Sequence, residues 1–191
     1  MTGVQKLYNH LGPKEKKFLI QEFPLLLYQW LEGDFSNRNR SEWLTLRSRA
    51  YDSVDALMIV LHYLKPYYPF RYPKTLYRLT GITHIPTTPE VVLKKGHISR
   101  RPLLSWTTLA SPYVAYREPT KKDIILKWSP VDPKCVAGSH RALLKIVKDL
   151  QQIPGSEAWM LRKMQKFLSN HNEREFLVYL YHPIKCTWEL A

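Results

Sequence analysis

Three groups of polar side chains in this chain combine residue types and positions that could do chemistry. Arg78 lies in the middle of a short apolar and β-branched run, where even a partly buried guanidinium needs an anionic partner. Hydroxyl side chains surround a tryptophan in the run Ser105–Thr108. Glu173 and Glu175 are two residues apart at the start of a strongly apolar run, so on an extended backbone both carboxylates would face one cleft. Together these groups could bind an anionic substrate and stabilise a developing positive charge.

Each group also has a purely structural explanation. Glu173 and Glu175 could belong to a charged turn before a strand. The hydroxyls of Ser105–Thr108 are ordinary residues for a strand. What distinguishes the groups is their order along the chain, which runs from an arginine through the hydroxyls to the paired carboxylates.

The cysteines and histidines follow no metal-binding or nucleophilic pattern. Cys135 and Cys186 are the two cysteines, and the chain has no CxxC pair, which excludes zinc ribbons and disulfide frameworks. We therefore predict no metal site, and so few cysteines favour a reducing compartment. His84, His97 and His140 fall in predicted turns, where a lone histidine is ordinarily a surface residue. A metal-free nuclease that uses these histidines stays as an alternative.

The first third of the chain has the hydrophobic periodicity of helices. Apolar residues within Phe18–Leu31 and within Trp43–Leu64 recur at steps of three and four residues. Pro24 should kink or restart the first helix, and Pro66 should end the second. Residues 1–73 are therefore predicted to form a helical N-terminal subregion.

From Lys74 onward the pattern is typical of strands, with two helices inserted. The predicted extended segments are Thr75–Thr80, two pieces within Gly96–Thr108, Asp123–Trp128 and Glu175–Tyr181. Ser139 and Ser156 are predicted to cap the two helices that precede the last strand. Because helices come first and strands later, the chain is predicted to be α+β rather than a doubly wound sheet. Residues 74–191 would form the core of one compact domain.

The chain is strongly basic. Its 191 residues include 29 Lys and Arg against 16 Asp and Glu, a formal net charge of +13, and 45% of them are hydrophobic. The hydrophobic content excludes a disordered chain, and the charge favours a polyanionic partner such as nucleic acid, an anionic membrane surface or a phosphorylated substrate. The basic runs are Lys14–Lys17, Asn37–Arg40, Lys94-Lys95, Arg100-Arg101, Lys121-Lys122 and Arg162–Lys166.

The sequence has no signal-like N-terminus and no window that could span a bilayer. Its most apolar window, Phe23–Leu31, is far too short and contains Pro24. We therefore expect a cytoplasmic protein without a membrane partner.

The order of the polar groups resembles the arginine-serine-glutamate class of mono-ADP-ribosyltransferases, the cholera-toxin-like group that includes small phage and bacterial toxin enzymes. That class has an arginine on an early strand, aromatic-Ser-Thr-Ser on a middle strand and Glu-x-Glu before a late strand. Arg78, Trp106-Thr107-Thr108 and Glu173-Arg174-Glu175 take these places here. The stretch Gly96–Tyr116 is similar throughout, from its glycine turn to the Ser-Pro start of a short helix. The similarity covers residues 74–182, and the helical leader resembles that of small phage transferases.

The chain departs from the pattern of this class at several positions. Leu79 follows the arginine, where the class often has Gly, and Leu109 stands where the triplet ends in Ser. Thr107 keeps the hydroxyl of the serine it replaces but adds a methyl group. The stretch before Glu173 is long and helical, so the acceptor-recognition loop is expected to differ.

The resemblance implies an ADP-ribosyltransferase-like split β-sheet core and NAD as the substrate. Glu175 would stabilise the oxocarbenium-like cation that forms when nicotinamide leaves, and Thr107 would orient Glu175. Arg78 would bind the phosphates of NAD, and Glu173 would position the acceptor. The remaining cofactor-binding residues would be Ser105, Thr108, Tyr113 and Tyr116.

The acceptor of ADP-ribose is the open part of this interpretation. The overall positive charge favours RNA or DNA, whereas Glu-x-Glu also fits a protein arginine, as in arginine-modifying relatives. A small basic enzyme of this kind would act as an intracellular toxin or phage effector, which implies a neutralising antitoxin protein. The alternative from another class is a non-catalytic, basic nucleic-acid-binding module, which needs neither Glu175 nor NAD.

Overall fold

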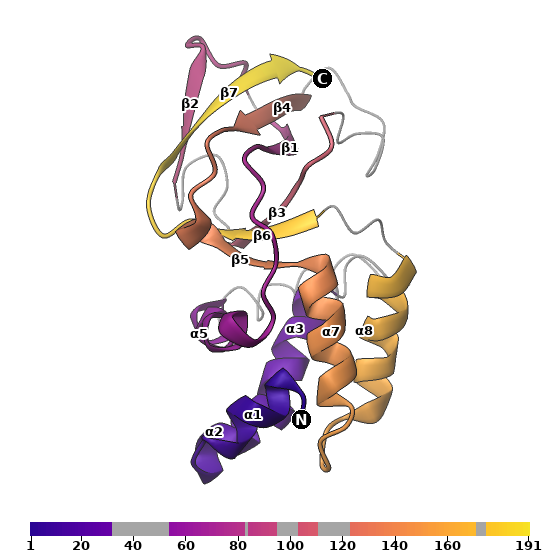
Figure 1. Ribbon diagram of the computed structural model, residues 1–191. Helices are drawn as coiled ribbons and strands as arrows, with labels where there is room; N and C mark the ends of the chain where they lie inside the picture. The colour runs from indigo at the N-terminus through magenta and orange to yellow at the C-terminus, as the bar shows by residue number, and fades with distance from the viewer. Residues whose placement is uncertain (32–53, 83, 95–102, 111–122, 171–174) are drawn as a thin grey trace. The chain divides into compact units, whose positions relative to one another are not determined.

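The computed structural model describes residues 1–31, 54–82, 84–94, 103–110, 123–170 and 175–191, and it confirms the α+β class (Figure 1). The chain divides into two compact units. Residues 1–70 and 140–173 form a unit that holds the α-helices, and residues 71–139 and 174–191 form a unit that holds the sheet. Residues 140–173, which the sequence analysis placed in the core, belong to the helical unit because their helices pack on the N-terminal ones. None of the helices in the described ranges is long and apolar enough to cross a membrane.

The helical unit is assembled from short helices whose ends follow local sequence signals. Thr2 caps the first helix by accepting the N–H of Gln5 at 3.1 Å. Pro24 is the second residue of a helix that follows a π-helical turn without a break, so the predicted restart at this proline is not seen and the irregularity lies in the turn before it. The elements are α1 (Gly3–Asn9), α2 (Pro13–Lys17), the π-helical turn (Phe18–Glu22), α3 (Phe23–Leu31), α5 (Val54–Leu64), a 3-10 turn (Lys65–Tyr67), α7 (His140–Leu150) and α8 (Ala158–Asn170).

The helices α7 and α8 confirm the two helices predicted after Ser139 and Ser156. Both are amphipathic and pack against each other. The buried side of α8 consists of Met160, Leu161, Met164, Phe167 and Leu168. The exposed side of α8 carries Arg162, Lys163 and Lys166, so this basic run faces solvent within its own unit.

A buried tyrosine ties the start of the helical unit to α7. The hydroxyl of Tyr68 accepts the N–H of Val4 at 2.8 Å and donates to Asp149 Oδ2 at 2.5 Å. Burial and the bond to Asp149 raise the pKa of the Tyr68 phenol well above its ordinary value. The backbone at Gly3 approaches this corner so closely that a Cβ there would lie 2.7 Å from the Cβ of Tyr67. The packing of α1 at this corner therefore depends on both the Tyr68 hydroxyl and the absence of a side chain at Gly3.

We expect Tyr68→Phe to lower the free energy of unfolding by about 1–3 kcal/mol, because it leaves the buried Val4 N–H and the Asp149 carboxylate without their shared partner. Urea unfolding monitored by circular dichroism measures this loss. Tyr63→Phe is the matched control, because Tyr63 is 60% exposed in the same unit. Equal stabilities of the two variants would contradict a structural role for the hydroxyl.

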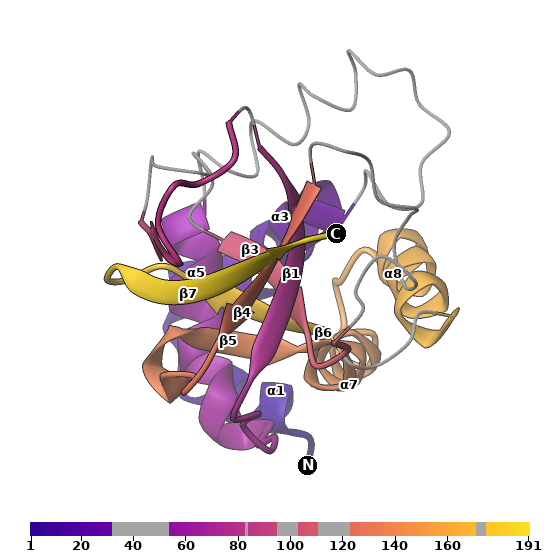
Figure 2. The same cartoon turned by 90° about the horizontal axis from the view of Figure 1, so that it is seen from above.

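The second unit is a seven-stranded antiparallel sheet (Figure 2). Four of its strands, β1, β3, β4 and β6, confirm predicted segments, whereas β2, β5 and β7 were not predicted. Among the described residues, six register pairs join β1 to β4 but a single pair joins β1 to β3, so the described part of the sheet is narrowly connected at that point. In spatial order the strands are β2 (Glu90–Leu93), β7 (Ile184–Leu190), β4 (Asp123–Trp128), β1 (Leu76–Gly81), β3 (Leu103–Thr107), β6 (Glu175–Tyr179) and β5 (Val136–Ser139).

Candidate functional site

A row of directly opposed residues crosses one face of the sheet through six of its strands. Residues that are register partners point their side chains to the same face, so the row defines a common surface. The row consists of Glu90 on β2, Thr187 on β7, Lys127 on β4, Tyr77 on β1, Thr107 on β3 and Glu175 on β6. Two residues that were selected from the sequence, Thr107 and Glu175, are therefore neighbours in the fold.

The pair of Thr107 and Glu175 has a chemistry of its own. The Thr107 side chain is buried, and its Oγ1 accepts the N–H of Leu109 at 3.2 Å. Because the oxygen already accepts a hydrogen bond, the hydroxyl proton is what Thr107 can offer to a further group. Glu175 is half-buried directly opposite, at a position where opposed Cβ atoms lie about 4.5–5.5 Å apart. The geometry therefore suits a hydroxyl that orients a carboxylate.

Arg78 lies in the middle of a strand, as the sequence predicted, but not on the face of Thr107 and Glu175. It follows Tyr77 on β1, so by strand alternation it belongs to the face opposite to Thr107 and Glu175. Its Nη1 donates to the backbone carbonyl of Ser105 on β3 at 2.6 Å. In the described part of the chain one register pair joins these strands, and this charge-assisted bond adds a further tie between β1 and β3. Arg78 thus holds the strand that carries Thr107.

Some of the other predicted site residues are described by the structure, and the rest lie outside the described residues. Ser105 is half-buried on the same face as Thr107, and Thr108 is exposed just beyond the end of β3. Glu173, Tyr113 and Tyr116 lie outside the described residues. The candidate nuclease residues His84 and His140 are exposed and buried, respectively, and His97 also lies outside the described residues.

A cavity of about 240 Å³ lies beside the row and contains three of its members. Its lining combines the aromatic ring of Tyr77 with the cation of Lys127, both members of the row. Trp188 also borders the cavity, but by strand alternation its side chain belongs to the other face, and its Nε1 donates to the carbonyl of Thr88 at 2.7 Å. Ligand pockets are commonly about 300–1,000 Å³, so this cavity suits one ring and its sugar rather than a whole dinucleotide. The full lining is Tyr77, Ala110, Ile125, Lys127, Thr187, Trp188 and Glu189.

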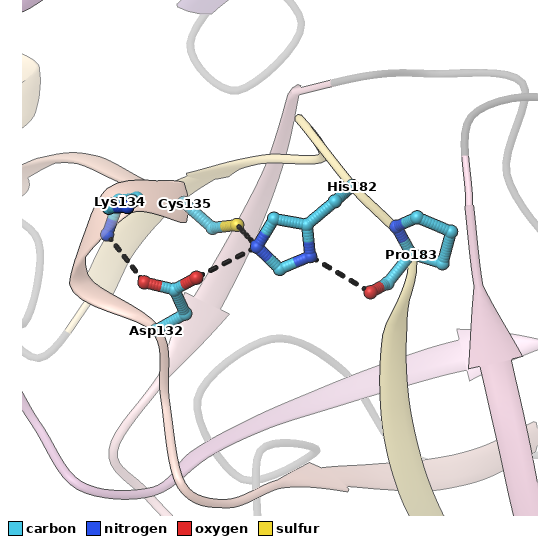
Figure 3. Close-up of polar contacts among 5 residues, drawn as sticks. All are labelled: Asp132, Lys134, Cys135, His182 and Pro183. Atoms are coloured by element: carbon cyan, nitrogen blue, oxygen red, sulfur yellow. Dashed lines mark hydrogen bonds and ion pairs between the residues drawn. The ribbon is translucent and has the colours of Figure 1, made fainter.

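A second polar cluster lies in the same unit and was not predicted (Figure 3). Nε2 of His182 lies 2.7 Å from Asp132 Oδ2 and 3.3 Å from the Sγ of Cys135. The other ring nitrogen, Nδ1, lies 3.0 Å from the carbonyl oxygen of Pro183, so it carries a proton. Asp132 Oδ1 accepts the backbone N–H of Lys134 at 3.0 Å.

These contacts shift the charges in the cluster. The N–H of Lys134, followed by the bond to His182, lowers the pKa of Asp132. The carbonyl of Pro183, followed by Asp132, raises the pKa of His182. A sequence signal existed in the spacing of Asp132 and Cys135, three residues apart, but His182 comes from a turn between later strands. This ligand set contains a single cysteine, so the CxxC pattern does not reveal it.

Comparisons with protein-family models, with curated proteins and with solved structures gave no significant match for this chain.

Proposed function

We propose that this protein is a mono-ADP-ribosyltransferase that transfers ADP-ribose from NAD to a macromolecular acceptor. The observation that supports this proposal best is the direct opposition of Thr107 and Glu175 on neighbouring strands. The third signature residue, Arg78, is on the next strand and contacts the backbone of the hydroxyl-bearing strand. The narrow connection between β1 and β3 also fits the split sheet that the resemblance implies.

The proposed reaction breaks the bond between the nicotinamide nitrogen and C1′ of the ribose. The bonding electrons leave with nicotinamide, and positive charge develops on the ribose ring, as in glycoside cleavage. The Glu175 carboxylate stabilises this cation, and the hydroxyl of Thr107 holds the carboxylate in place. A nucleophilic atom of the acceptor then bonds to C1′ and loses its proton to a carboxylate, for which Glu173 is the candidate.

The cavity beside the row is the proposed place for one half of NAD. Tyr77 offers a ring on which a base can stack, and Lys127 offers a cation for phosphate oxygens. Lys127 shares the face of Thr107 and Glu175, whereas Arg78 does not. We therefore assign phosphate binding to Lys127 and the holding of β3 to Arg78. This assignment changes the role that the sequence suggested for Arg78.

For the acceptor we propose RNA or DNA, because the chain has a net charge of +13 and exposes Arg162, Lys163 and Lys166 along α8. Such an enzyme would act in the cytoplasm as a toxin or phage effector, with a neutralising protein as partner. The experiment that tests the function is incubation of the full chain with labelled NAD and total cell extract, followed by separate digestion with protease and with nuclease. Label that nuclease removes and protease leaves is the expected result. Label with the reverse behaviour would identify a protein acceptor, such as arginine.

Replacing Arg162, Lys163 and Lys166 together by Gln should weaken binding to single-stranded RNA and reduce its dependence on salt. Each phosphate contact with a single strand contributes about 0.7 to the slope of log affinity against log salt, so the slope should fall by about 2. A salt series of RNA-binding measurements checks this, and NAD hydrolysis without acceptor should stay unchanged.

The matched control replaces Lys6, Lys14 and Lys17, three exposed lysines of α1 and α2, and removes the same charge. An equal loss in both triple variants would contradict a specific role for α8. If the acceptor is instead a protein arginine, the α8 variant should modify it normally, and Glu173→Gln should block transfer while NAD hydrolysis stays measurable.

A further inference from the structure

We propose that Asp132, Cys135 and His182 form a binding site for a zinc ion. Their ligand atoms are a thiolate sulfur, an imidazole nitrogen and a carboxylate oxygen, and all lie within 4.8 Å of one another. They come from the 3-10 turn after β4 (Pro133–Cys135), the residue before it, and the connection between β6 and β7. Both segments belong to the sheet unit, and the inference is independent of the proposed NAD chemistry.

The contacts in Figure 3 do not have the arrangement of a Cys–His–Asp relay. In a relay the thiol and the carboxylate use opposite ring nitrogens of the histidine, so that a proton passes through the ring. Here Cys135 and Asp132 both approach the same atom, Nε2 of His182. A cation among the three atoms would attract all of them.

The three ligand atoms lie slightly closer together than the ligands of a zinc ion, so small shifts would admit it. Zinc bonds to sulfur at about 2.3 Å and to nitrogen or oxygen at about 2.0–2.2 Å, so tetrahedral ligands lie about 3.3–3.6 Å apart. A sulfur and a nitrogen ligand lie at the upper end of this range, about 3.5–3.6 Å apart, so the separation of Cys135 Sγ and His182 Nε2, which is 3.3 Å, needs to grow by about 0.2–0.3 Å. The carboxylate oxygen of Asp132, at 2.7 Å from Nε2, needs to retreat by about 0.6 Å to reach that spacing.

Each ligand that faces solvent is already oriented by a backbone group. A zinc-bound histidine characteristically donates its other ring N–H to a carbonyl or carboxylate, and Nδ1 of His182 has the carbonyl of Pro183 at 3.0 Å. The N–H of Lys134 holds Oδ1 of Asp132, which leaves Oδ2 directed at the ring. Thiolate and imidazole together favour zinc over magnesium or calcium, which prefer oxygen ligands.

The site has three protein ligands and an exposed side. Cys135 is fully buried, whereas the side chains of His182 and Asp132 are 48% and 36% exposed and line a cavity of about 560 Å³. Zinc sites with three protein ligands keep a fourth position for water or substrate, whereas purely structural sites use four protein ligands. We therefore place the open coordination position of the ion toward this cavity.

The test is titration of the metal-free full chain with Co²⁺ as a spectroscopic substitute for Zn²⁺. We expect one ion per chain and a near-ultraviolet charge-transfer band from thiolate to cobalt, which Zn²⁺ abolishes by displacement. Cys135→Ala should lose the band, and Cys186→Ala, which removes the other buried thiol, should keep it. The absence of the band in the wild-type chain, or its persistence in Cys135→Ala, would overturn the proposal.

If Cys135→Ala fails to fold, a variant of the exposed ligand His182 tests the zinc site instead. His182→Gln should weaken Zn²⁺ binding by more than the roughly 10–100-fold that the loss of an outer-shell partner costs. Zn²⁺ should raise the unfolding temperature of the wild type and of His84→Gln, an exposed-histidine control, but not that of His182→Gln. Equal Zn²⁺ affinities of His182→Gln and the wild type would overturn the site.

Discussion

We expect Glu175→Gln to reduce NAD cleavage by a factor on the order of 100 or more, because it removes the negative charge next to the developing ribose cation without changing the size of the side chain. Glu175 begins β6 and is half-buried opposite Thr107, so the amide fits the same space. Nicotinamide release under saturating NAD measures the loss. The unfolding midpoint in urea should stay close to that of the wild type.

The control for this charge removal is Glu22→Gln, at an exposed position of the helical unit. It should cleave NAD at the wild-type rate. If Glu175→Gln also cleaves at that rate, the catalytic carboxylate is elsewhere, and Glu173 is the next residue to replace. A companion variant, Thr107→Ser, keeps the hydroxyl that we assign to orienting Glu175 and should retain most of the activity.

Arg78→Lys should reduce kcat for NAD cleavage by about 10- to 150-fold, the equivalent of the roughly 1.5–3 kcal/mol carried by a hydrogen bond to a charged group. The guanidinium bonds the carbonyl of Ser105 at 2.6 Å and supplements the one register pair between β1 and β3. A lysine ammonium lacks the planar fork, so β3 and its Thr107 lose their position relative to Glu175. Steady-state kinetics with varied NAD separates kcat from KM.

Whether Arg78→Lys changes kcat or KM distinguishes a positioning role from phosphate binding and from a purely structural role. A fall in kcat is the expected result for a positioning residue. A rise in KM at constant kcat would contradict it and return Arg78 to phosphate binding, the role that the sequence suggested. A lower stability with unchanged constants per folded molecule would make Arg78 a purely structural residue. Lys127→Gln, on the face of Glu175, should raise KM instead.

Strand composition explains which parts of the sheet could be predicted. The strands β1, β4 and β6 are rich in β-branched and aromatic residues, and each stands out in the sequence. In contrast, β5 reads Val-Ala-Gly-Ser and has neither the periodicity nor the bulk of a strand. The strand β7 alternates buried Ile184 and Cys186 with exposed Lys185 and Thr187, so its period of two residues was a usable signal.

The site itself depends on information that local sequence does not contain. The order of arginine, hydroxyls and glutamates selected Thr107 and Glu175, but only strand pairing shows that they are directly opposed. The same pairing places Arg78 on the face opposite to Thr107 and Glu175, because Tyr77 pairs with Thr107 and the next residue of a strand points the other way. The cluster around His182 joins two distant turns, and no single segment of the sequence has the pattern of a metal site.

The proposed reaction requires that this chain break the bond between nicotinamide and ribose in NAD. The most direct test incubates the folded full chain with NAD and total cell extract, so that acceptors are present, and measures free nicotinamide chromatographically. Our account predicts nicotinamide release by the wild-type chain above the level of extract alone, and no such release by Glu175→Gln. NAD that stays intact with the folded wild-type chain would contradict the account and leave a basic nucleic-acid-binding module as the better description of this protein.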